Sequence, residues 1–370
     1  MKHLYLVAGE LSGDAHGASL MRALQAQLGE VSFSGAGGPE MQSLASGPFL
    51  EWTSHAVVGL WEVIKNYGYF RREFHRMIGE IGALQPDAVI LIDYPGFNLR
   101  LAKALRAKVP ALKIIYYISP QVWAWNRRRI PKMARWLDLM ICLFPFEKEL
   151  YEASGLRTEF AGHPMLDELE KKRLPDVSRD LTSIGLFPGS REREVRKILP
   201  IMLEAGRILH RRHPELRFAI PAASEKLLTL IREMTAGFPH CEVTLRNAYP
   251  LMQTCGAGLI ASGTATLEAA FLGLPYALLY KVSPLTYEVG RRVIRVPFLG
   301  MVNILAGREV IPEFVQKKAD PTSIAMSVES FLFDPQKRLQ LESDLRNVIA
   351  MLGERGAASK AAQAVCELLT

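Results

Sequence analysis

The amino-acid sequence predicts an α/β protein made of two Rossmann-like, doubly wound domains in tandem. Three observations support this fold class. In each half of the chain, short β-rich runs alternate with helical patterns. Several of these runs are apolar throughout, which is typical of strands buried on both faces of a parallel sheet. The length of 370 residues fits two domains, since about 100–200 residues per domain is usual.

The first half begins with a predicted strand at residues 4–8, which ends in Gly9-Glu10-Leu11-Ser12-Gly13. A helix is expected from about residue 14 to residue 28, followed by a strand at 31–34 and a glycine-rich turn at 35–38. The remaining strands of this half are predicted at 88–92, 113–118 and 137–143.

A polar stretch at 167–180 is the best candidate for a linker. The alternation restarts with a strand at 183–187, a loop at 188–191 and a helix to about residue 211. Later strands are expected at 217–220, 242–245, 257–260 and 276–279, and helices between 321 and 369. The predicted domains are 1–165 and 166–335, followed by C-terminal helices at 336–370. Tandem domains of this type are expected to bind a ligand in the cleft between them.

The composition limits the classes of function. The net charge of +7 favours anionic partners, such as nucleic acid, anionic lipid or phosphorylated substrates. The start does not resemble a signal peptide and no run of about 18 apolar residues is present, so we expect a cytosolic protein. Four well-separated cysteines form no CxxC pair, and neither DxD nor HExxH occurs, so no metal site is predicted.

Two loops of the second half have the character of phosphate-binding loops. Pro188-Gly189-Ser190-Arg191 lies between a strand and a helix, where free N–H groups and an arginine suit phosphate. Ser262-Gly263-Thr264-Ala265-Thr266 lets the backbone approach a diphosphate, and Glu268 could accept both ribose hydroxyls. The alternatives are a plain turn and an ordinary helix start. Neither loop is a P-loop, and no GxGxxG follows the first strand.

Three segments of the first half are further candidates. Asp93 follows a strand and could act as a general base, although an Asp turn before Pro95 is a common structural feature. Residues 119–129 combine two tryptophans with three arginines, which suits stacking on sugars or bases, or else a core tryptophan beside a solvated helix start. The apolar, aromatic stretch 56–70 suits a membrane interface or an acyl-chain groove, and a buried core helix is the alternative.

The sequence resembles the lipid-A-disaccharide synthases. The resemblance is carried by six motifs in the family's order, extends from about residue 4 to residue 316 and continues through the helical tail. The motifs are Ala8-Gly9-Glu10-Leu11-Ser12-Gly13-Asp14, Ser119-Pro120-Gln121-Val122-Trp123-Ala124-Trp125, Gly162-His163-Pro164, Pro188-Gly189-Ser190-Arg191, Ser262-Gly263-Thr264-Ala265-Thr266-Leu267-Glu268 and Asn303-Ile304-Leu305-Ala306-Gly307-Arg308-Glu309, the last followed by Pro312-Glu313 and Gln316.

This resemblance implies the glycosyltransferase-B fold, with the donor bound by the C-terminal domain, the acceptor at the N-terminal domain and no cofactor or required metal. It implies transfer of 2,3-diacylglucosamine from its UDP form to 2,3-diacylglucosamine 1-phosphate, giving a β-1′,6-linked disaccharide phosphate and UDP. Asp93 resembles the family's proposed base. Where the family often has a second acidic residue, this chain has Gly96, which leaves Asp93 as the only carboxylate of its loop.

The remaining contacts are expected from the resemblance and from the loops. Donor contacts are Ser190, Arg191, Gly263, Thr264, Thr266, Glu268, Lys281 and Asn303. Acceptor and phosphate contacts are Glu10, Ser12, Gln121, Trp123, Arg127 and Arg128. Acyl or membrane contacts are Val58, Leu60, Trp61, Tyr69 and Phe70.

The partners follow from the same interpretation. They are a UDP-sugar, an acylated monosaccharide phosphate and an anionic membrane surface, without nucleic acid. We expect the protein in the cytoplasm, peripheral at the inner membrane, and the resemblance suggests a homodimer with exchanged C-terminal segments. A UDP-sugar epimerase of the same fold and a basic RNA- or membrane-binding protein are the alternatives.

Overall fold

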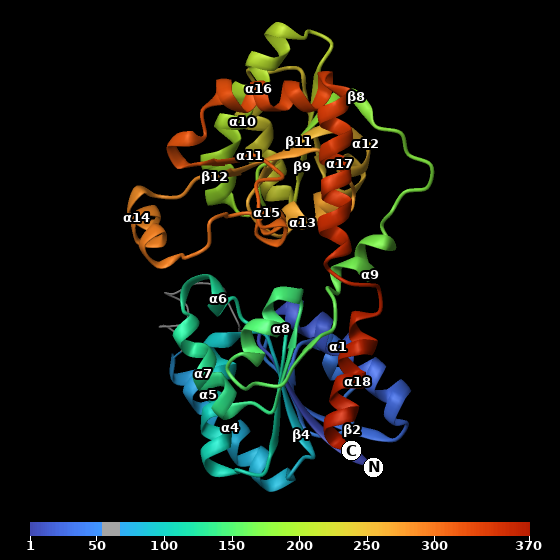
Figure 1. The fold of residues 1–370 in the computed structure, drawn as a ribbon, viewed down its shortest axis with the longest axis vertical. Coiled ribbons are helices and arrows are strands. Elements are labelled where there is room, and N and C mark those ends of the chain that lie inside the picture. Colours follow the sequence, from blue (N-terminus) through green and yellow to red (C-terminus); the bar gives the residue numbers. More distant parts are fainter. Residues whose placement is uncertain (54–66) are drawn as a thin grey trace. The chain divides into compact units, whose positions relative to one another are not determined.

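The computed structural model describes residues 1–53 and 67–370, which form two compact units (Figure 1). The first unit consists of residues 1–164 together with 352–370, and the second consists of residues 165–351. The chain therefore enters the second unit after Pro164 and returns to the first at Leu352. The predicted C-terminal segment 336–370 is divided between the two units.

The described part of the first unit is built on a parallel sheet with the strand order β3-β2-β1-β4-β5-β6-β7. Every residue of β4 is buried, as the continuous apolar run at 88–92 predicts for a central strand. The strands are β1 (Lys2–Ala8), β2 (Val31–Gly37), β3 (Phe49–Glu51), β4 (Ala88–Ile92), β5 (Lys113–Tyr117), β6 (Leu139–Cys142) and β7 (Thr158–Phe160).

Helices connect these strands. They are α1 (Leu11–Leu28), α2 (Pro39–Gln42), α4 (Tyr67–Leu84), α5 (Pro95–Lys108), α6 (Val122–Trp125), α7 (Ile130–Trp136) and α8 (Pro145–Glu152), with a short 3₁₀ turn at Arg127–Arg129. In the two described ranges, no helix is long and apolar enough to cross a bilayer.

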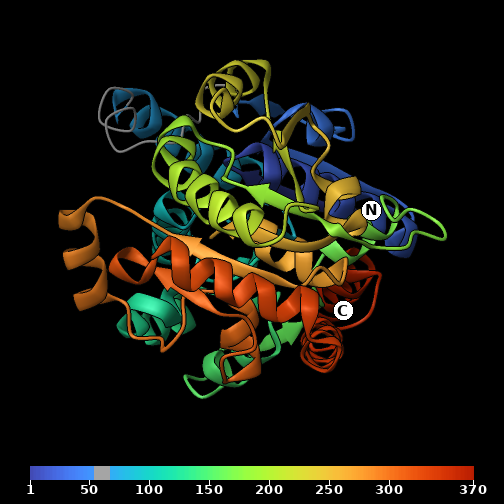
Figure 2. The same ribbon diagram turned by 90° about the horizontal axis from the view of Figure 1, so that it is seen from above.

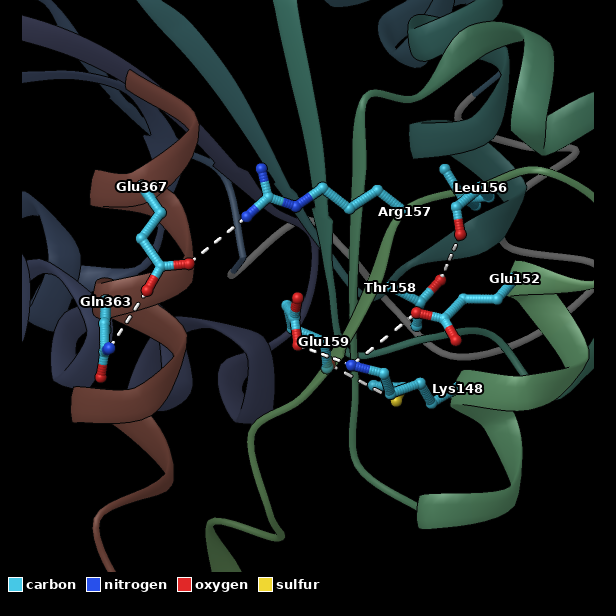
Figure 3. Close-up of polar contacts among 9 residues, drawn as sticks. Lys148, Glu152, Leu156, Arg157, Thr158, Glu159, Gln363 and Glu367 are labelled. Carbon is cyan, nitrogen blue, oxygen red and sulfur yellow. Dashed lines mark hydrogen bonds and ion pairs between the residues drawn. The ribbon is translucent and has the colours of Figure 1, made fainter. Parts of the chain in front are cut away.

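The last helix, α18 (Ala357–Leu369), packs against α1. Its buried side chains are small, since they are four alanines and Val365, and small side chains allow two helices to approach closely. Arg157, just before β7, and Glu367 of α18 point toward one another in Figure 3 and form an ion pair of 3.3 Å. Both groups are half-exposed, so apolar packing rather than this pair holds α18.

The glycine-rich segment after residue 34 differs from the prediction of a turn. Strand β2 continues to Gly37, because Gly35 adopts a φ of +145° and lies so close to the Leu6 carbonyl that a Cβ atom would overlap it. The turn begins at Gly38. There the buried carboxylate of Asp14, on α1, accepts hydrogen bonds of 2.9–3.0 Å from the backbone N–H groups of Gly38, Glu40 and Met41.

The second unit has a parallel sheet with the strand order β10-β9-β8-β11-β12-β13. The strands are β8 (Asp180–Phe187), β9 (Arg217–Ala222), β10 (Cys241–Leu245), β11 (Cys255–Ala261), β12 (Tyr276–Tyr280) and β13 (Glu313–Val315). Its helices are α9 (Met165–Glu170), α10 (Glu192–Arg212), α11 (Glu225–Thr235), α12 (Ala248–Thr254), α13 (Thr264–Phe271), α14 (Pro284–Val293), α15 (Met301–Ala306), α16 (Pro321–Phe333) and α17 (Pro335–Ala350), with a 3₁₀ turn at Gln316–Lys318.

Candidate functional site

The second unit contains a pocket of about 600 Å³ at the carboxyl ends of its strands. Strand order reverses between β8 and β11, and a crevice at such a reversal is where doubly wound sheets bind ligands. The walls come from the ends of β8, β9, β10 and β11 and from the helices that follow. They are Phe187, Pro188, Gly189, Ser190, Arg191, Glu194, Pro221, Ala222, Ala223, Arg246, Ala248, Tyr249, Met252, Ala261, Ser262, Gly263, Thr264, Ala265 and Glu268.

Five of the predicted donor contacts line this pocket: Ser190, Arg191, Gly263, Thr264 and Glu268. The helices α10 and α13 begin at this wall, so their first N–H groups are available to an anion. The side chain of Arg191 is 71% exposed and forms an ion pair with Glu194 at 3.2 Å. An exposed pair of this kind is weak, so the guanidinium can exchange Glu194 for phosphate oxygens.

Glu268 and Tyr249 form the polar pair of the pocket wall. The Tyr249 hydroxyl donates to the Glu268 carboxylate at 3.3 Å, and Lys172 lies over the Tyr249 ring at 4.2 Å. Burial raises the pKa of Glu268 from its usual value. The carboxylate is therefore held in a partly desolvated wall, where it can accept hydrogen bonds from sugar or ribose hydroxyls.

The polar pocket residues Arg246 and Tyr249 are among those that the sequence did not predict. Arg246 follows β10 with a φ of +52°, and its backbone N–H donates to the carbonyl of Ala222 at 2.8 Å. Its exposed side chain brings a second cation to the pocket wall. The signal that could have found it is its position one residue after the predicted strand 242–245, at the edge where ligands bind.

Three predicted donor contacts do not line the pocket. Thr266 is buried, and its hydroxyl donates to the carbonyl of Gly263 at 2.7 Å, which supports the loop from behind. Asn303 is fully buried: its Nδ2 donates to Ile311 and Glu313, and its Oδ1 accepts from the N–H groups of Val310 and Ile311. Lys281 is exposed after β12. Thr266 and Asn303 thus hold nearby backbone in place, and their donor contacts remain predictions.

In the first unit, the predicted catalytic residue Asp93 follows β4 in a loop with unusual backbone geometry. Asp93 and Tyr94 have φ values of +45° and +49°, a region that costs free energy for residues with side chains. The loop is held because the Asp93 carbonyl accepts hydrogen bonds from Asn98 Nδ2 at 2.9 Å and from the Tyr116 hydroxyl at 2.6 Å. These hydrogen bonds fix the backbone from which the Asp93 side chain projects.

Glu10 lies near Asp93, because β1 and β4 are neighbours in the sheet. Gly9 packs so tightly under the Tyr94 ring that a Cβ atom would overlap it. Burial raises the pKa of Asp93, and the negative charge of Glu10 raises it further. The structure therefore brings together the predicted base and one predicted acceptor contact.

Trp123, a predicted acceptor contact, is buried, and the contact remains a prediction. Its indole N–H donates to Glu147 at 2.8 Å, and the other carboxylate oxygen accepts from the N–H groups of Leu143 and Phe144. Burial raises the pKa of Glu147 to about 7. The exposed tryptophan of this segment is Trp125, whose ring lies 5.0 Å from the guanidinium of Arg129.

The remaining predicted acceptor contacts lie at the surface. Ser12, Gln121, Arg127 and Arg128 are exposed, and Arg127 Nε donates to the carbonyl of Trp123 at 3.0 Å. Ser12 follows β1 and Gln121 follows β5, so both lie at the sheet edge that carries Asp93.

The predicted membrane stretch is only partly described. Phe70 packs edge-on against buried Trp52 at 5.9 Å, and Tyr69 packs against Phe70 at 5.7 Å, which favours the core-helix alternative for these two residues. Val58, Leu60 and Trp61 lie outside the described residues. Within the described ranges, no three His, Cys, Asp or Glu side chains gather as metal ligands would.

The chain is similar to known proteins over nearly its whole length. A family model described as lipid-A-disaccharide synthetase matches residues 4–368. A lipid-A-disaccharide synthase of Trichlorobacter lovleyi is 40% identical over 100% of this chain and 98% of its own length. The synthase of Geobacter metallireducens is 38% identical over 100% of this chain and 97% of its own.

Solved structures with the same fold are distant in sequence. A UDP complex of MnaA from S. aureus has a TM-score of 0.64 at 13% identity and covers 100% of this chain and 97% of its own. A UDP complex of a ugt transferase from Siraitia grosvenorii has a TM-score of 0.62 at 10% identity and covers 100% of both. The UDP-GlcNAc 2-epimerase of Neisseria meningitidis, bound to UDP-GlcNAc, has a TM-score of 0.60 at 13% identity and covers 100% and 99%. These likenesses confirm the predicted fold class.

Proposed function

We infer the function from one premise: this chain belongs to the lipid-A-disaccharide synthetase family. It is a hexosyltransferase of lipid A biosynthesis. We propose that it joins UDP-2,3-diacylglucosamine to 2,3-diacylglucosamine 1-phosphate, with inversion at the anomeric carbon, and that it releases UDP.

The pocket of the second unit is the observation that carries this proposal. Its volume of about 600 Å³, two helix N-termini and the cations Arg191 and Arg246 suit a nucleoside diphosphate. Phosphate oxygens would bind Arg191 and the N–H groups of Thr264 and Ala265, and Glu268 would accept hydrogen bonds from ribose. Charge develops on the departing UDP during the reaction, so fixed donors at this place lower the barrier.

The loop of the first unit supplies the base. In the proposal, Asp93 takes the proton from the acceptor hydroxyl while that oxygen attacks the anomeric carbon and the bond to UDP breaks. A raised pKa suits this work, because a base whose pKa is nearer the working pH accepts a proton more effectively. Exposed Arg127 and Arg128 would meet the phosphate of the acceptor.

The test is UDP release from the purified full-length chain. UDP-diacylglucosamine is supplied with and without the monosaccharide phosphate, and products are examined by mass spectrometry. Release that requires the acceptor, together with a disaccharide phosphate, is expected. Release without acceptor would indicate a hydrolase or the alternative UDP-sugar epimerase. A protein that neither releases nor binds UDP would contradict the proposal.

We also propose that the protein works in the cytoplasm at the surface of the inner membrane. Acylated substrates reside in a bilayer, and the net charge of +7 favours anionic headgroups. Binding to anionic vesicles is expected to weaken as salt rises, because salt screens exposed charges. Vesicle binding that responds to neither salt nor anionic lipid would contradict this placement.

A homodimer with exchanged C-terminal segments is a further proposal. The connection between α17 and α18 comprises only residues 351–356, and α18 completes the first unit by packing on α1. The same contact could be made by α18 of a second copy, as domain swapping exchanges identical elements. Sedimentation equilibrium should then give twice the chain mass of 41.3 kDa, and a monomer mass at micromolar concentration would contradict the exchange.

A further inference from the structure

Helix α14 (Pro284–Val293) is a feature of the second unit that the sheet and the pocket described above leave unexplained. It stands away from the sheet in both views (orange in Figures 1 and 2). Its described side chains include no buried one, whereas α10, α11 and α13 each bury several. A helix whose described side chains are all at least partly exposed contributes little to the stability of the unit through them, so its composition calls for another explanation.

Apolar side chains on and after α14 face solvent. Val289 is 55% exposed and Val293 is 41% exposed, and residues four apart lie on the same face of a helix. Ile294, the next residue, is 44% exposed. One exposed aliphatic residue is ordinary, but three within six positions of a projecting element form a patch.

The same segment is strongly basic. Between residues 281 and 297 there are four cations (Lys281, Arg291, Arg292 and Arg295) and one carboxylate, Glu288, which gives a net charge of +3. Glu288 is shared, since it contacts Arg291 at 2.8 Å and Arg292 at 3.6 Å. Arg295 is exposed. The cations therefore greatly exceed what the local carboxylate can neutralise.

We propose that α14 and residues 294–297, called the α14 surface here, bind an anionic lipid bilayer. An apolar patch flanked by arginines matches the interface of such a bilayer, where aliphatic side chains enter the acyl boundary and cations meet headgroup phosphates. This inference rests on the proposed function, because an enzyme with acylated substrates works at a lipid surface. It adds a contact from the second unit, which sequence reasoning did not foresee.

The phosphates of a nucleic acid would bind the arginines but would gain nothing from contact with the exposed valines. A lipid surface would bind both the arginines and the valines. Variants of Val289 and Val293 should therefore weaken binding to lipid but not to nucleic acid. That difference decides between them.

The experiment measures sedimentation of the full-length chain with vesicles of phosphatidylglycerol and phosphatidylethanolamine, with phosphatidylcholine vesicles as the neutral reference. Arg291→Gln, Arg292→Gln and Arg295→Gln together should weaken binding by about 100-fold, since each cation near the surface contributes about 5-fold. The pair Val289→Ser and Val293→Ser should also weaken binding, at least 5-fold. The matched control is Arg196→Gln, Arg211→Gln and Arg232→Gln, three exposed arginines of α10 and α11 with the same loss of charge; it should change binding less than 5-fold.

The outcomes separate this inference from the function on which it rests. UDP affinity, measured by calorimetry, should remain unchanged in all variants, because none of these residues lines the pocket. Equal losses for the α14 triple variant and the control would overturn the inference even if acceptor-dependent UDP release persists. The inference would also be overturned if the valine variant bound vesicles normally while the arginine variant lost binding to single-stranded RNA. That result would indicate nucleic acid as the partner. If the wild-type chain binds vesicles through α14 but releases no UDP when donor and acceptor are supplied, the proposed function is contradicted and the inference about α14 stands.

Discussion

Asp93 has two properties that a general base requires: a carboxylate in a fixed loop and a raised pKa. Asp93→Asn keeps the size of the side chain and removes the proton acceptor. We expect turnover to fall by about 100-fold or more, since general-base catalysis is typically worth 10²–10⁴. Steady-state UDP release measures this, with UDP affinity as the control for folding. Near-normal turnover would remove Asp93 from the mechanism.

Glu10 offers a test of the electrostatics around Asp93. Asp93 accepts a proton only when ionised, so activity is lost as pH falls through its pKa. The negative charge of Glu10 raises that pKa, and Glu10→Gln should lower it. The acidic limb of the pH–rate profile should therefore move to lower pH in the variant. Glu30→Gln, at an exposed position elsewhere on the unit, should leave the limb in place; a limb that moves equally in both variants would argue against the coupling.

Arg191 tests the pocket of the second unit. Hydrogen bonds to charged groups are worth about 1.5–3 kcal/mol, so Arg191→Ala should weaken UDP binding by about 10- to 100-fold. Arg196→Ala is the matched control, since Arg196 lies on α10, the helix that Arg191 caps, and pairs with a glutamate but does not line the pocket. Calorimetry compares the two. Equal affinities for both variants would show that phosphate does not meet Arg191.

Pocket residues that belong to a loop motif could be predicted from the sequence. Residues whose position depends on the packing of the whole unit could not. Ser190, Arg191, Gly263 and Thr264 stand directly after strands, and the structure places them in the wall. Asn303 also belongs to a motif, but its side-chain amide is hydrogen-bonded to the backbone of Val310 and Ile311. Motif membership indicates that a residue matters and does not distinguish a ligand contact from a structural role. Arg246 had no motif at all.

At the scale of elements, α8 and the segment 119–129 are joined by one buried carboxylate. Glu147 accepts hydrogen bonds from Trp123 and from two backbone N–H groups at the start of α8. Its pKa of about 7 lies above the usual 4.5 of glutamate, so the folded state holds the proton more tightly than the unfolded state. Stability therefore falls as pH rises from about 4.5 to about 7.

Glu147→Gln should remove this part of the pH dependence. The free energy of unfolding of the wild type, relative to the variant, should fall by on the order of 3 kcal/mol between those pH values. Urea unfolding at pH 4.5, 6 and 8 measures the difference. Parallel pH profiles for the two proteins would mean that Glu147 ionises normally in the folded state.

The strands divide by how strongly the sequence marks them. Continuous apolar runs predicted β4 and β5 within one residue of their ends. The edge strands β3, β7 and β13 have three residues each and are mostly half-buried, so they lack both length and an apolar run. Such short edge strands form because they pair with a neighbouring strand, so their own residues show little β pattern.

At the scale of the whole molecule, α18 belongs to the first unit although it follows the entire second unit along the chain. Deletion of residues 352–370 uncovers apolar surface of α1 and should cost the first unit about 4 kcal/mol, or roughly 8–16 °C in Tm. The second unit should still bind UDP, because its core and pocket are complete within residues 165–351. Calorimetric scans with and without UDP measure both effects.

Arg157→Ala is the control for this deletion. It removes only a surface ion pair to α18 and should change stability by less than about 0.5 kcal/mol. A deletion that behaves like Arg157→Ala would mean that α18 contributes no packing. A deletion that abolishes UDP binding would mean that the units do not fold independently.

The return of the chain to its first unit also sets an order of events during synthesis. Strands β1–β7 leave the ribosome well before α18, because the 206 residues from 165 to 370 are synthesised after them. At about 5–20 residues per second, the nascent first unit waits roughly 10–40 s for its last helix. The second unit is contiguous and can fold during that interval. Residues 1–164 are therefore exposed to chaperones, proteases and neighbouring nascent chains until α18 has been synthesised.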